Sequence, residues 1–118
     1  MQAVQSGLSW NAVRKFLDII GLSQLDLAKY LTIPKRTFAR RREAGTFNRR
    51  ESEQVLRLAE ISQAALELFD GDTAATRTWL TSQVRGLGKA RPIDFAQSEF
   101  GAREVCVLIG RLADGVFS

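Results

Sequence analysis

The chain has 118 residues, 45% of them hydrophobic and 25% charged, which suits one domain or two small ones and argues against wholesale disorder. It contains no histidine and a single cysteine, Cys106, so an internal disulfide and a zinc finger are excluded. No stretch approaches the roughly 20 apolar residues that span a bilayer, and residues 1–9 lack the features of a signal peptide. We therefore expect a cytoplasmic protein without membrane attachment.

Apolar residues recur at helical spacing almost throughout, which predicts an all-α fold of about seven helices. Ser9 is placed to cap a first helix that ends at Gly21, and Ser23 is placed to cap a second. Pro34 suits the first turn of a third helix, which we expect to run to Gly45.

A long fourth helix is predicted over residues 49–69. Asn48 and Glu51 have the spacing of a capping box at its start, with Asn in place of the usual Ser or Thr. At 1.5 Å per residue this helix would extend roughly 30 Å, enough to link two regions. Asp72 is placed to cap a short fifth helix that ends near Leu80.

The remaining sequence predicts an irregular segment followed by two helices. The irregular segment covers residues 81–91, and Pro92 opens a short sixth helix. The last helix is expected after Gly101 and before Gly115, with Cys106 buried in its apolar run. The predicted architecture is an N-terminal bundle, residues 1–59, joined by the long helix to a small helical domain, residues 60–118.

The two predicted regions differ in net charge. Residues 1–59 hold 11 Lys and Arg against 5 Asp and Glu, whereas residues 60–118 hold 6 against 8. The first region therefore carries a net +6 and the second a net −2, within a total of +4. A basic surface captures polyanions, so nucleic acid is the first candidate partner for residues 1–59. A merely solvated cationic face is the alternative on charge alone.

The segment from Ser23 to Arg42 has the organisation of a helix-turn-helix. Two short helices flank a turn at residues 32–34, and Ala28 is the small residue needed where the second helix crosses the first. The apolar residues that would fix the crossing angle are Leu27, Leu31, Ile33 and Phe38. Thr32 departs from the glycine that is usual in such a turn.

The second helix of this motif holds five cations in eight residues. The predicted DNA-binding residues are Gln24, Lys35, Arg36, Thr37, Arg40, Arg41 and Arg42. With Phe38 facing the core, the helical period points Arg36, Thr37 and Arg40 outward, where arginine can read guanine. We expect Arg41 and Arg42, nearer the core side, to hold phosphates, with Gln24 donating to another. An arginine-rich surface helix without a ligand is the alternative, and Arg41 stands where an apolar residue is usual.

These residues resemble a known family. The run from Ile33 to Arg41, followed by Gly45, Glu51-Ser52 and residues 56–59, resembles the helix-turn-helix half of Xre/MbcA/ParS-type antitoxins. The second half is similar to the same family's toxin-binding domain at Ala75, Trp79-Leu80, Leu87-Gly88, Pro92-Ile93, Gly101-Ala102, Gly110-Arg111-Leu112 and Gly115-Val116-Phe117. Gln83-Val84 depart from the Pro-Asn pair that is usual after the Trp-Leu helix.

The resemblance implies an antitoxin of a type II toxin–antitoxin system with two partners. One is a RES-domain toxin, from a family that degrades NAD, whose active-site cleft the last helix and tail would cover. The other is operator DNA of its own operon, bound by an antitoxin that is usually a homodimer within the larger toxin–antitoxin assembly. The candidate toxin-binding residues are Arg111, Gly115, Val116, Phe117 and Ser118.

The residues themselves leave alternatives open. Val116 and Phe117 follow a helix terminator, so they either tuck back onto the domain or anchor a partner. A helix-turn-helix repressor without a toxin is the rival function. An enzyme is disfavoured, since the sequence has no glycine-rich phosphate loop and no nucleophile–base spacing, and we expect no catalytic residue, metal or cofactor. The first helix, with Leu8 and Trp10 ahead of its core stripe, is our candidate for a dimer surface.

Overall fold

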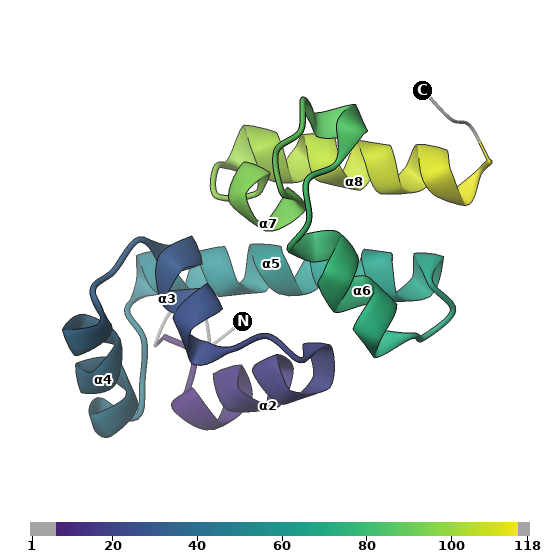
Figure 1. Cartoon of the computed structure of the whole chain (residues 1–118). Coiled ribbons are helices and arrows are strands. Elements are labelled where there is room, and N and C mark those ends of the chain that lie inside the picture. Colours follow the sequence, from purple (N-terminus) through teal and green to yellow (C-terminus); the bar gives the residue numbers. More distant parts are fainter. Residues whose placement is uncertain (1–6, 116–118) are drawn as a thin grey trace. The chain divides into compact units, whose positions relative to one another are not determined.

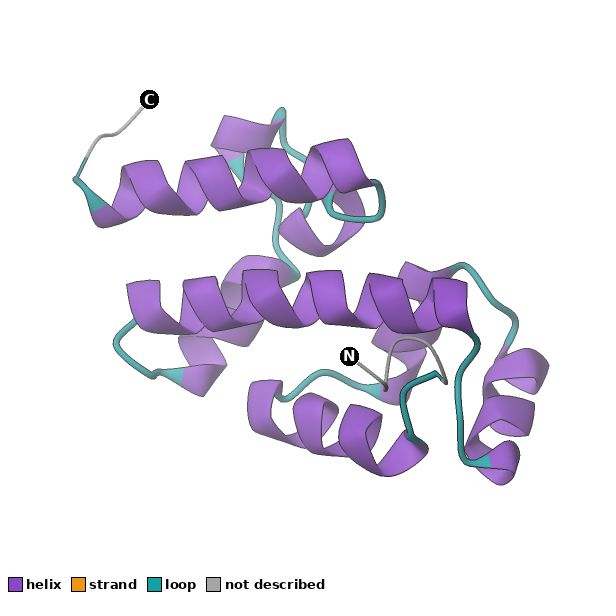
Figure 2. Ribbon diagram, turned by 180° about the vertical axis from the view of Figure 1, so that it is seen from behind, coloured by secondary structure: helices purple, strands orange, loops and turns teal. Residues whose placement is uncertain are grey.

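The structure is a computed structural model that describes residues 7–115. Within that range the chain forms seven α-helices, α2 to α8, and one short 3-10 helix, η1, with loops between them and no named strand (Figures 1 and 2). The predicted all-α fold of about seven helices is confirmed. The chain separates into two compact units, and the boundary in the sequence falls between Leu56 and Arg57.

The first unit contains three complete helices and the start of a fourth. These are α2 (Trp10–Ile20), α3 (Gln24–Leu31), α4 (Lys35–Ala44) and the first part of α5 (Arg49–Leu68). The predicted caps form: the Ser9 hydroxyl accepts from the Ala12 N–H, and Ser23 forms a capping box with Asp26. At the other ends, Gly21 and Gly45 adopt left-handed conformations with φ near +80°.

An aromatic cluster occupies the core of the first unit. The ring centroid of Phe38 lies 5.9 Å from that of Trp10 and 5.7 Å from that of Phe47, both with edge-to-face geometry. Leu8 is buried and Trp10 is half-buried against this cluster. These two residues therefore pack into their own unit, and a dimer surface on the first helix stays a prediction.

The second unit is formed by the rest of α5 and the elements that follow it. These are α6 (Thr73–Leu80), η1 (Arg85–Leu87), α7 (Pro92–Phe95) and α8 (Glu99–Ala113). Asp72 caps α6 by accepting a hydrogen bond from the Ala75 N–H at 3.0 Å, as predicted. The segment that we expected to be irregular contains η1, held by backbone pairing between Val84 and Ala90. No helix in residues 7–115 is long and apolar enough to span a membrane.

Helix α8 begins earlier than the sequence predicts. Ser98 caps it by accepting from the Gly101 N–H at 2.9 Å, so Gly101 lies inside the first turn. A Cβ at Gly101 would stand 1.7 Å from the Phe95 carbonyl oxygen, which explains why glycine is needed at this close approach to α7.

Cys106 is exposed on α8, so the prediction that it is buried is wrong. The buried stripe of α8 passes through Val105, Leu108 and Ile109, and a 100° step moves Cys106 off it. Neighbouring atoms still screen the thiol partly from water, and this desolvation, together with the Glu60 carboxylate, raises the pKa of Cys106.

Candidate nucleic-acid interface and the outer face of the last helix

Helices α3 and α4 form the predicted helix-turn-helix. Thr32 ends α3 in the left-handed conformation with φ +59°, the position where glycine is usual. Its N–H donates to the Lys29 carbonyl at 3.1 Å, and the Ile33 N–H donates to Ala28 at the same distance. These bonds satisfy the last carbonyls of α3 and direct the chain into α4.

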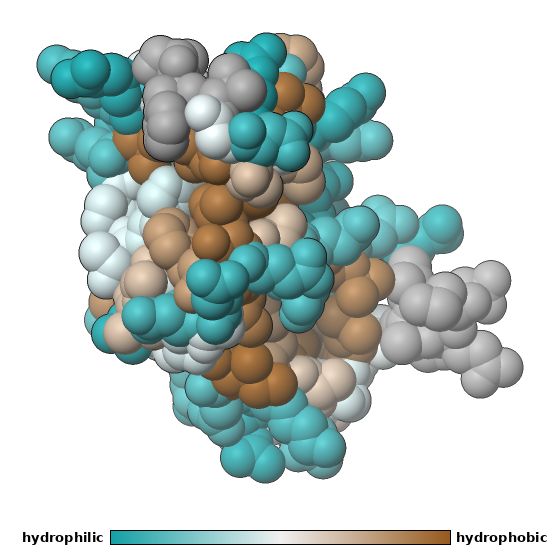
Figure 3. Space-filling view, turned by 90° about the vertical axis from the view of Figure 1, so that its right-hand side faces the viewer, coloured by the Kyte–Doolittle hydropathy of each residue, from teal (hydrophilic) through white to brown (hydrophobic). Residues whose placement is uncertain are grey.

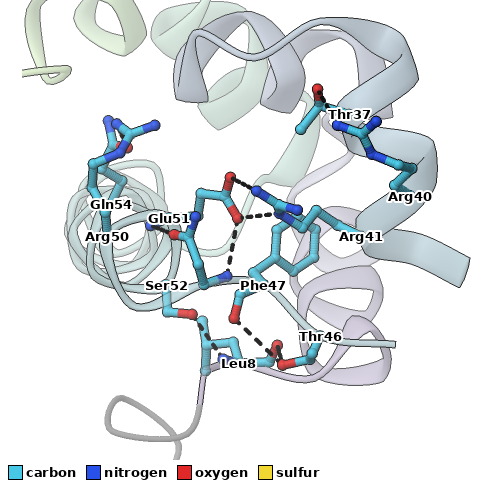
Figure 4. Close-up of polar contacts among 11 residues, drawn as sticks. Leu8, Thr37, Arg40, Arg41, Thr46, Phe47, Arg50, Glu51, Ser52 and Gln54 are labelled. Carbon is cyan, nitrogen blue, oxygen red and sulfur yellow. Dashed lines mark hydrogen bonds and ion pairs between the residues drawn. The ribbon is translucent and has the colours of Figure 1, made fainter. Parts of the chain in front are cut away.

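Several predicted DNA-binding cations are exposed on α4. Lys35, Arg36, Arg40 and Arg42 are exposed, whereas Thr37 is half-buried. Arg40 Nη2 lies 3.4 Å from the Thr37 hydroxyl, so these two predicted base-reading side chains contact each other (Figure 4). Helix α4 therefore offers a cationic surface, with Thr37 nearer the core than the helical period alone indicates.

A shallow groove of about 340 Å³ runs between α3 and α4. Its lining is Gln24, Leu25, Ala28, Lys35, Phe38, Ala39 and Arg42. Arg42 Nη1 donates to Gln24 Oε1 across the groove. The groups left on the rim of the groove are mainly hydrogen-bond donors. They are the amide hydrogens of Gln24, the ammonium of Lys35 and the other guanidinium hydrogens of Arg42. Such a rim suits phosphate oxygens or the acceptor edge of guanine.

Arg41 is separated from the other predicted DNA-binding residues. Its Nε and Nη2 donate to the two carboxylate oxygens of Glu51 at 2.8 and 3.1 Å (Figure 4). Glu51 is only 1% exposed, and Oε1 of the same carboxylate also accepts from the Asn48 N–H at 3.0 Å. Asn48 Oδ1 accepts in return from the Glu51 N–H at 2.8 Å, which confirms the predicted capping box.

The Glu51 carboxylate is held in its charged form by these contacts. Burial pushes the pKa of Glu51 upward, but the Arg41 hydrogen bond, the Asn48 N–H and the nearby guanidinium charges outweigh it, so the pKa lies below its ordinary 4.5. The same hydrogen bond raises the pKa of Arg41. The sequence analysis identified Glu51 as a capping residue and as part of the family motif, but not as the partner of an ion pair. The unusual Arg41 at an apolar position was the signal that it has an internal partner.

In the second unit, the outer face of α8 carries two apolar side chains. Phe100 is 67% exposed and Val107 is 46% exposed, and their seven-residue spacing places them on one side of the helix. Apolar side chains also stand out among hydrophilic ones on the face of the molecule drawn in Figure 3. The sequence analysis did not identify this pair. The signal that could have found it is that both apolar residues lie off the buried stripe of α8.

The predicted toxin-binding residues fall at the end of α8. Arg111 is exposed, and its eleven-residue spacing from Phe100 puts it on the same outer face. Gly115 is exposed with φ +76°, a conformation that favours glycine. Val116, Phe117 and Ser118 lie outside the described residues. Across residues 7–115, the structure has no group of three or more His, Cys, Asp and Glu side chains that could hold a metal.

A second groove, open and about 460 Å³ in volume, lies beside Trp79 in the second unit. Phe69 and Trp79 both line it, with ring centroids 6.4 Å apart and ring planes tilted by 57°. Gln83 and Val84, which replace the usual Pro-Asn pair, line its edge. The departure from the usual pair therefore falls on the lining of a surface groove.

Comparison with known proteins identifies both parts of the chain. Residues 1–60 match the model of the antitoxin Xre-like helix-turn-helix domain, and residues 64–115 match that of the antitoxin Xre/MbcA/ParS C-terminal toxin-binding domain. The chain is 34% identical over 119 residues to an antitoxin Xre of Yersinia enterocolitica, covering 100% of this chain and 80% of that protein. It is 30% identical over 116 residues to an antitoxin Xre of Photorhabdus laumondii, covering 98% of this chain and 78% of that protein.

A solved structure shares the fold. A chain in the crystal structure of the M. tuberculosis MbcT–MbcA toxin–antitoxin complex superposes with a TM-score of 0.72 at 22% identity, covering 90% of this chain and 94% of that one. The two family models and the curated relatives show that the chain belongs to the Xre family of antitoxins, with a helix-turn-helix domain followed by a C-terminal toxin-binding domain.

Proposed function

We propose that this antitoxin neutralises a RES-domain toxin that degrades NAD, and that it represses its own operon by binding operator DNA. In this proposal residues 1–59 bind DNA and residues 60–118 bind the toxin. The observation that carries the DNA part is the cluster of exposed cations on the second helix of a formed helix-turn-helix. The C-terminal toxin-binding family match supports the other part.

On DNA, α4 lies in the major groove. Arg36 and Arg40 are exposed there and reach base edges, where a bidentate arginine–guanine contact contributes about 1–3 kcal/mol of discrimination. Lys35, Arg42 and Gln24 form the donor rim of the α3–α4 groove and bind phosphates, which fixes the register of the helix. Arg41 takes no part in this contact, because its guanidinium is bound to Glu51. A homodimer would place two such helices on successive half-sites.

On the toxin, the outer face of α8 and the tail cover the active-site cleft. Phe100 and Val107 supply exposed apolar area of the kind that anchors an interface. Arg111 lies on the same face and adds a cation for an anionic or NAD-shaped pocket. Gly115 has a positive φ that turns the chain beyond the helix. Val116, Phe117 and Ser118 complete the proposed toxin-binding set.

Co-expression tests the proposal. A RES protein encoded next to this gene is produced in a host, with and without the antitoxin, and growth is followed. We expect the antitoxin to restore growth, and deletion of Val116, Phe117 and Ser118 to weaken this rescue while DNA binding is kept. If the RES protein stays lethal while the chain still binds its own promoter, the rival function, a repressor without a toxin, is favoured.

A further inference from the structure

A bidentate ion pair joins α4 to the helix that follows it. Arg41 Nε and Nη2 meet the two oxygens of Glu51 at 2.8 and 3.1 Å, and the side chain of Glu51 is 1% exposed. An arginine fork on a carboxylate fixes both direction and distance, which a single hydrogen bond does not. The pair therefore constrains the orientation of α4 relative to the start of α5 within the first unit.

Neighbouring backbone bonds hold the same corner. The Arg41 carbonyl accepts from the N–H groups of Gly45 at 2.9 Å and Thr46 at 3.2 Å, so the residue that makes the ion pair also accepts the bonds that cap the end of α4. On the α5 side, the Ser52 hydroxyl accepts from the Leu8 N–H at 2.8 Å in a buried bond (Figure 4). The start of α5, which carries Glu51, is thus held to its own unit by other hydrogen bonds. Arg41 is the side chain that joins α4 to it through the ion pair.

We propose that Arg41 is a positioning residue of the DNA-binding surface: its ion pair with Glu51 sets the angle at which α4 presents Arg36 and Arg40. This inference rests on the operator binding proposed above. Base contacts need side chains placed within about 0.5 Å, so a small rotation of α4 weakens them together. The opposing hypothesis is that Arg41 leaves Glu51 to clamp a phosphate. That step would strand a buried carboxylate without its cation, which is strongly unfavourable.

Operator titrations with four variants separate these hypotheses. The variants are Arg41→Met, Glu51→Gln, the two combined, and Glu53→Gln as the matched control on an exposed carboxylate of the same helix. Glutamine at position 51 keeps one oxygen for the Asn48 N–H, but its NH2 group cannot accept from Arg41, so the two-bond fork is lost together with the charge. Binding to a duplex of the promoter in front of its own gene is measured by fluorescence anisotropy over a series of salt concentrations.

If Arg41 positions α4, the two single variants should lose equal affinity for the duplex. Arg41→Met and Glu51→Gln should each weaken binding to the duplex by about tenfold. The combined variant should lose no more affinity, because both substitutions remove the same ion pair. The slope of log K against log salt should stay that of the wild type, because no phosphate contact is removed. Glu53→Gln should bind like the wild type or slightly tighter.

A phosphate clamp predicts a different pattern. Glu51→Gln would then bind as tightly as the wild type or tighter, while Arg41→Met would lose affinity and lower the salt slope by about 1. That result would overturn the inference. If no variant differs from the wild type, the inference is also overturned. A wild-type chain that does not bind the duplex at any salt instead contradicts the operator proposal itself.

Arg41→Lys keeps the test valid if the methionine variant does not fold. Lysine keeps the charge but cannot make the two-bond fork, so a positioning role predicts weakened binding at an unchanged salt slope. A clamp predicts nearly wild-type binding, since lysine binds phosphate well as a point charge. Cooperative thermal unfolding, followed by circular dichroism, verifies that each variant is folded at the assay temperature.

Discussion

Arg42 donates a hydrogen bond to the side-chain oxygen of Gln24, which joins α4 to the first residue of α3. The bond uses one lone pair of the amide oxygen, and the NH2 group of Gln24 and the other guanidinium hydrogens of Arg42 remain donors. We therefore expect the α3–α4 groove to prefer anions.

Gln24→Glu tests that preference. The substitution keeps an acceptor for Arg42 but replaces the amide donors by a negative charge, so we expect weaker binding to the promoter duplex than with Gln24→Ala. Fluorescence anisotropy at moderate salt measures both, with Gln83→Glu in the second unit as a control for the change in net charge. Wild-type affinity for Gln24→Glu would exclude Gln24 from the interface.

Arg36→Ala and Arg40→Ala test the base-reading face. Each should reduce affinity for the operator by about 1–3 kcal/mol and relax the preference for one base pair, as expected for lost contacts to guanine. Both residues are exposed, so the fold should be unaffected. Binding is measured on the wild-type operator and on single-base variants of it. Equal binding by wild type and both variants rejects this face of α4.

The pH dependence of stability tests the buried carboxylate. The pKa of Glu51 is lowered in the folded chain, so its charged form stabilises the fold above the ordinary value of 4.5, and this stabilisation is lost as the pH falls through the lower folded value. Denaturant unfolding at a series of acid pH values should show a steeper loss of stability for the wild type than for Glu51→Gln. Parallel curves for the two proteins contradict the assignment.

Two glycines of α8 are expected to respond in opposite ways. A Cβ at Gly101 would meet the Phe95 carbonyl oxygen at 1.7 Å, so Gly101→Ala should destabilise the chain by about 1–3 kcal/mol, as overpacking does. Gly110 has nothing within 4 Å of an added Cβ, and alanine should stabilise the helix there by about 0.5–1 kcal/mol. Thermal unfolding measures both, and a neutral Gly101→Ala would show that α7 and α8 are not so closely packed.

Local signals explain how much of the fold was predictable. Ser9, Ser23 and Asp72 cap the helices that the sequence assigned to them, because a capping side chain acts on backbone N–H groups only two or three residues away. The start of α8 was misplaced because Gly101 was interpreted as a helix boundary. Its role depends on the approach of Phe95, a tertiary contact with no local signature.

The candidate site was predictable in composition and less so in geometry. The cations of α4 were identified from the sequence, but the helical period alone could not show that Arg41 meets Glu51, since that pairing depends on how α4 packs near α5. The exposure of Cys106 was missed for a similar reason, because an apolar run does not by itself show which residues face the core. Phe100 and Val107 lie on the face of α8 opposite its buried stripe. The predicted toxin-binding residues included only Arg111 and the residues that follow the helix, so this pair was missed.

The consumption of NAD by the purified, neighbour-encoded RES protein tests the central claim most directly. We expect that adding this chain stops NAD loss in proportion to its amount. Phe100→Asp with Val107→Asp should weaken this inhibition at least about tenfold, whereas Ile19→Asp, on an exposed apolar residue of the first unit, should leave it unchanged. NAD loss that continues at the same rate in an excess of the wild-type chain would contradict neutralisation of the toxin by this chain.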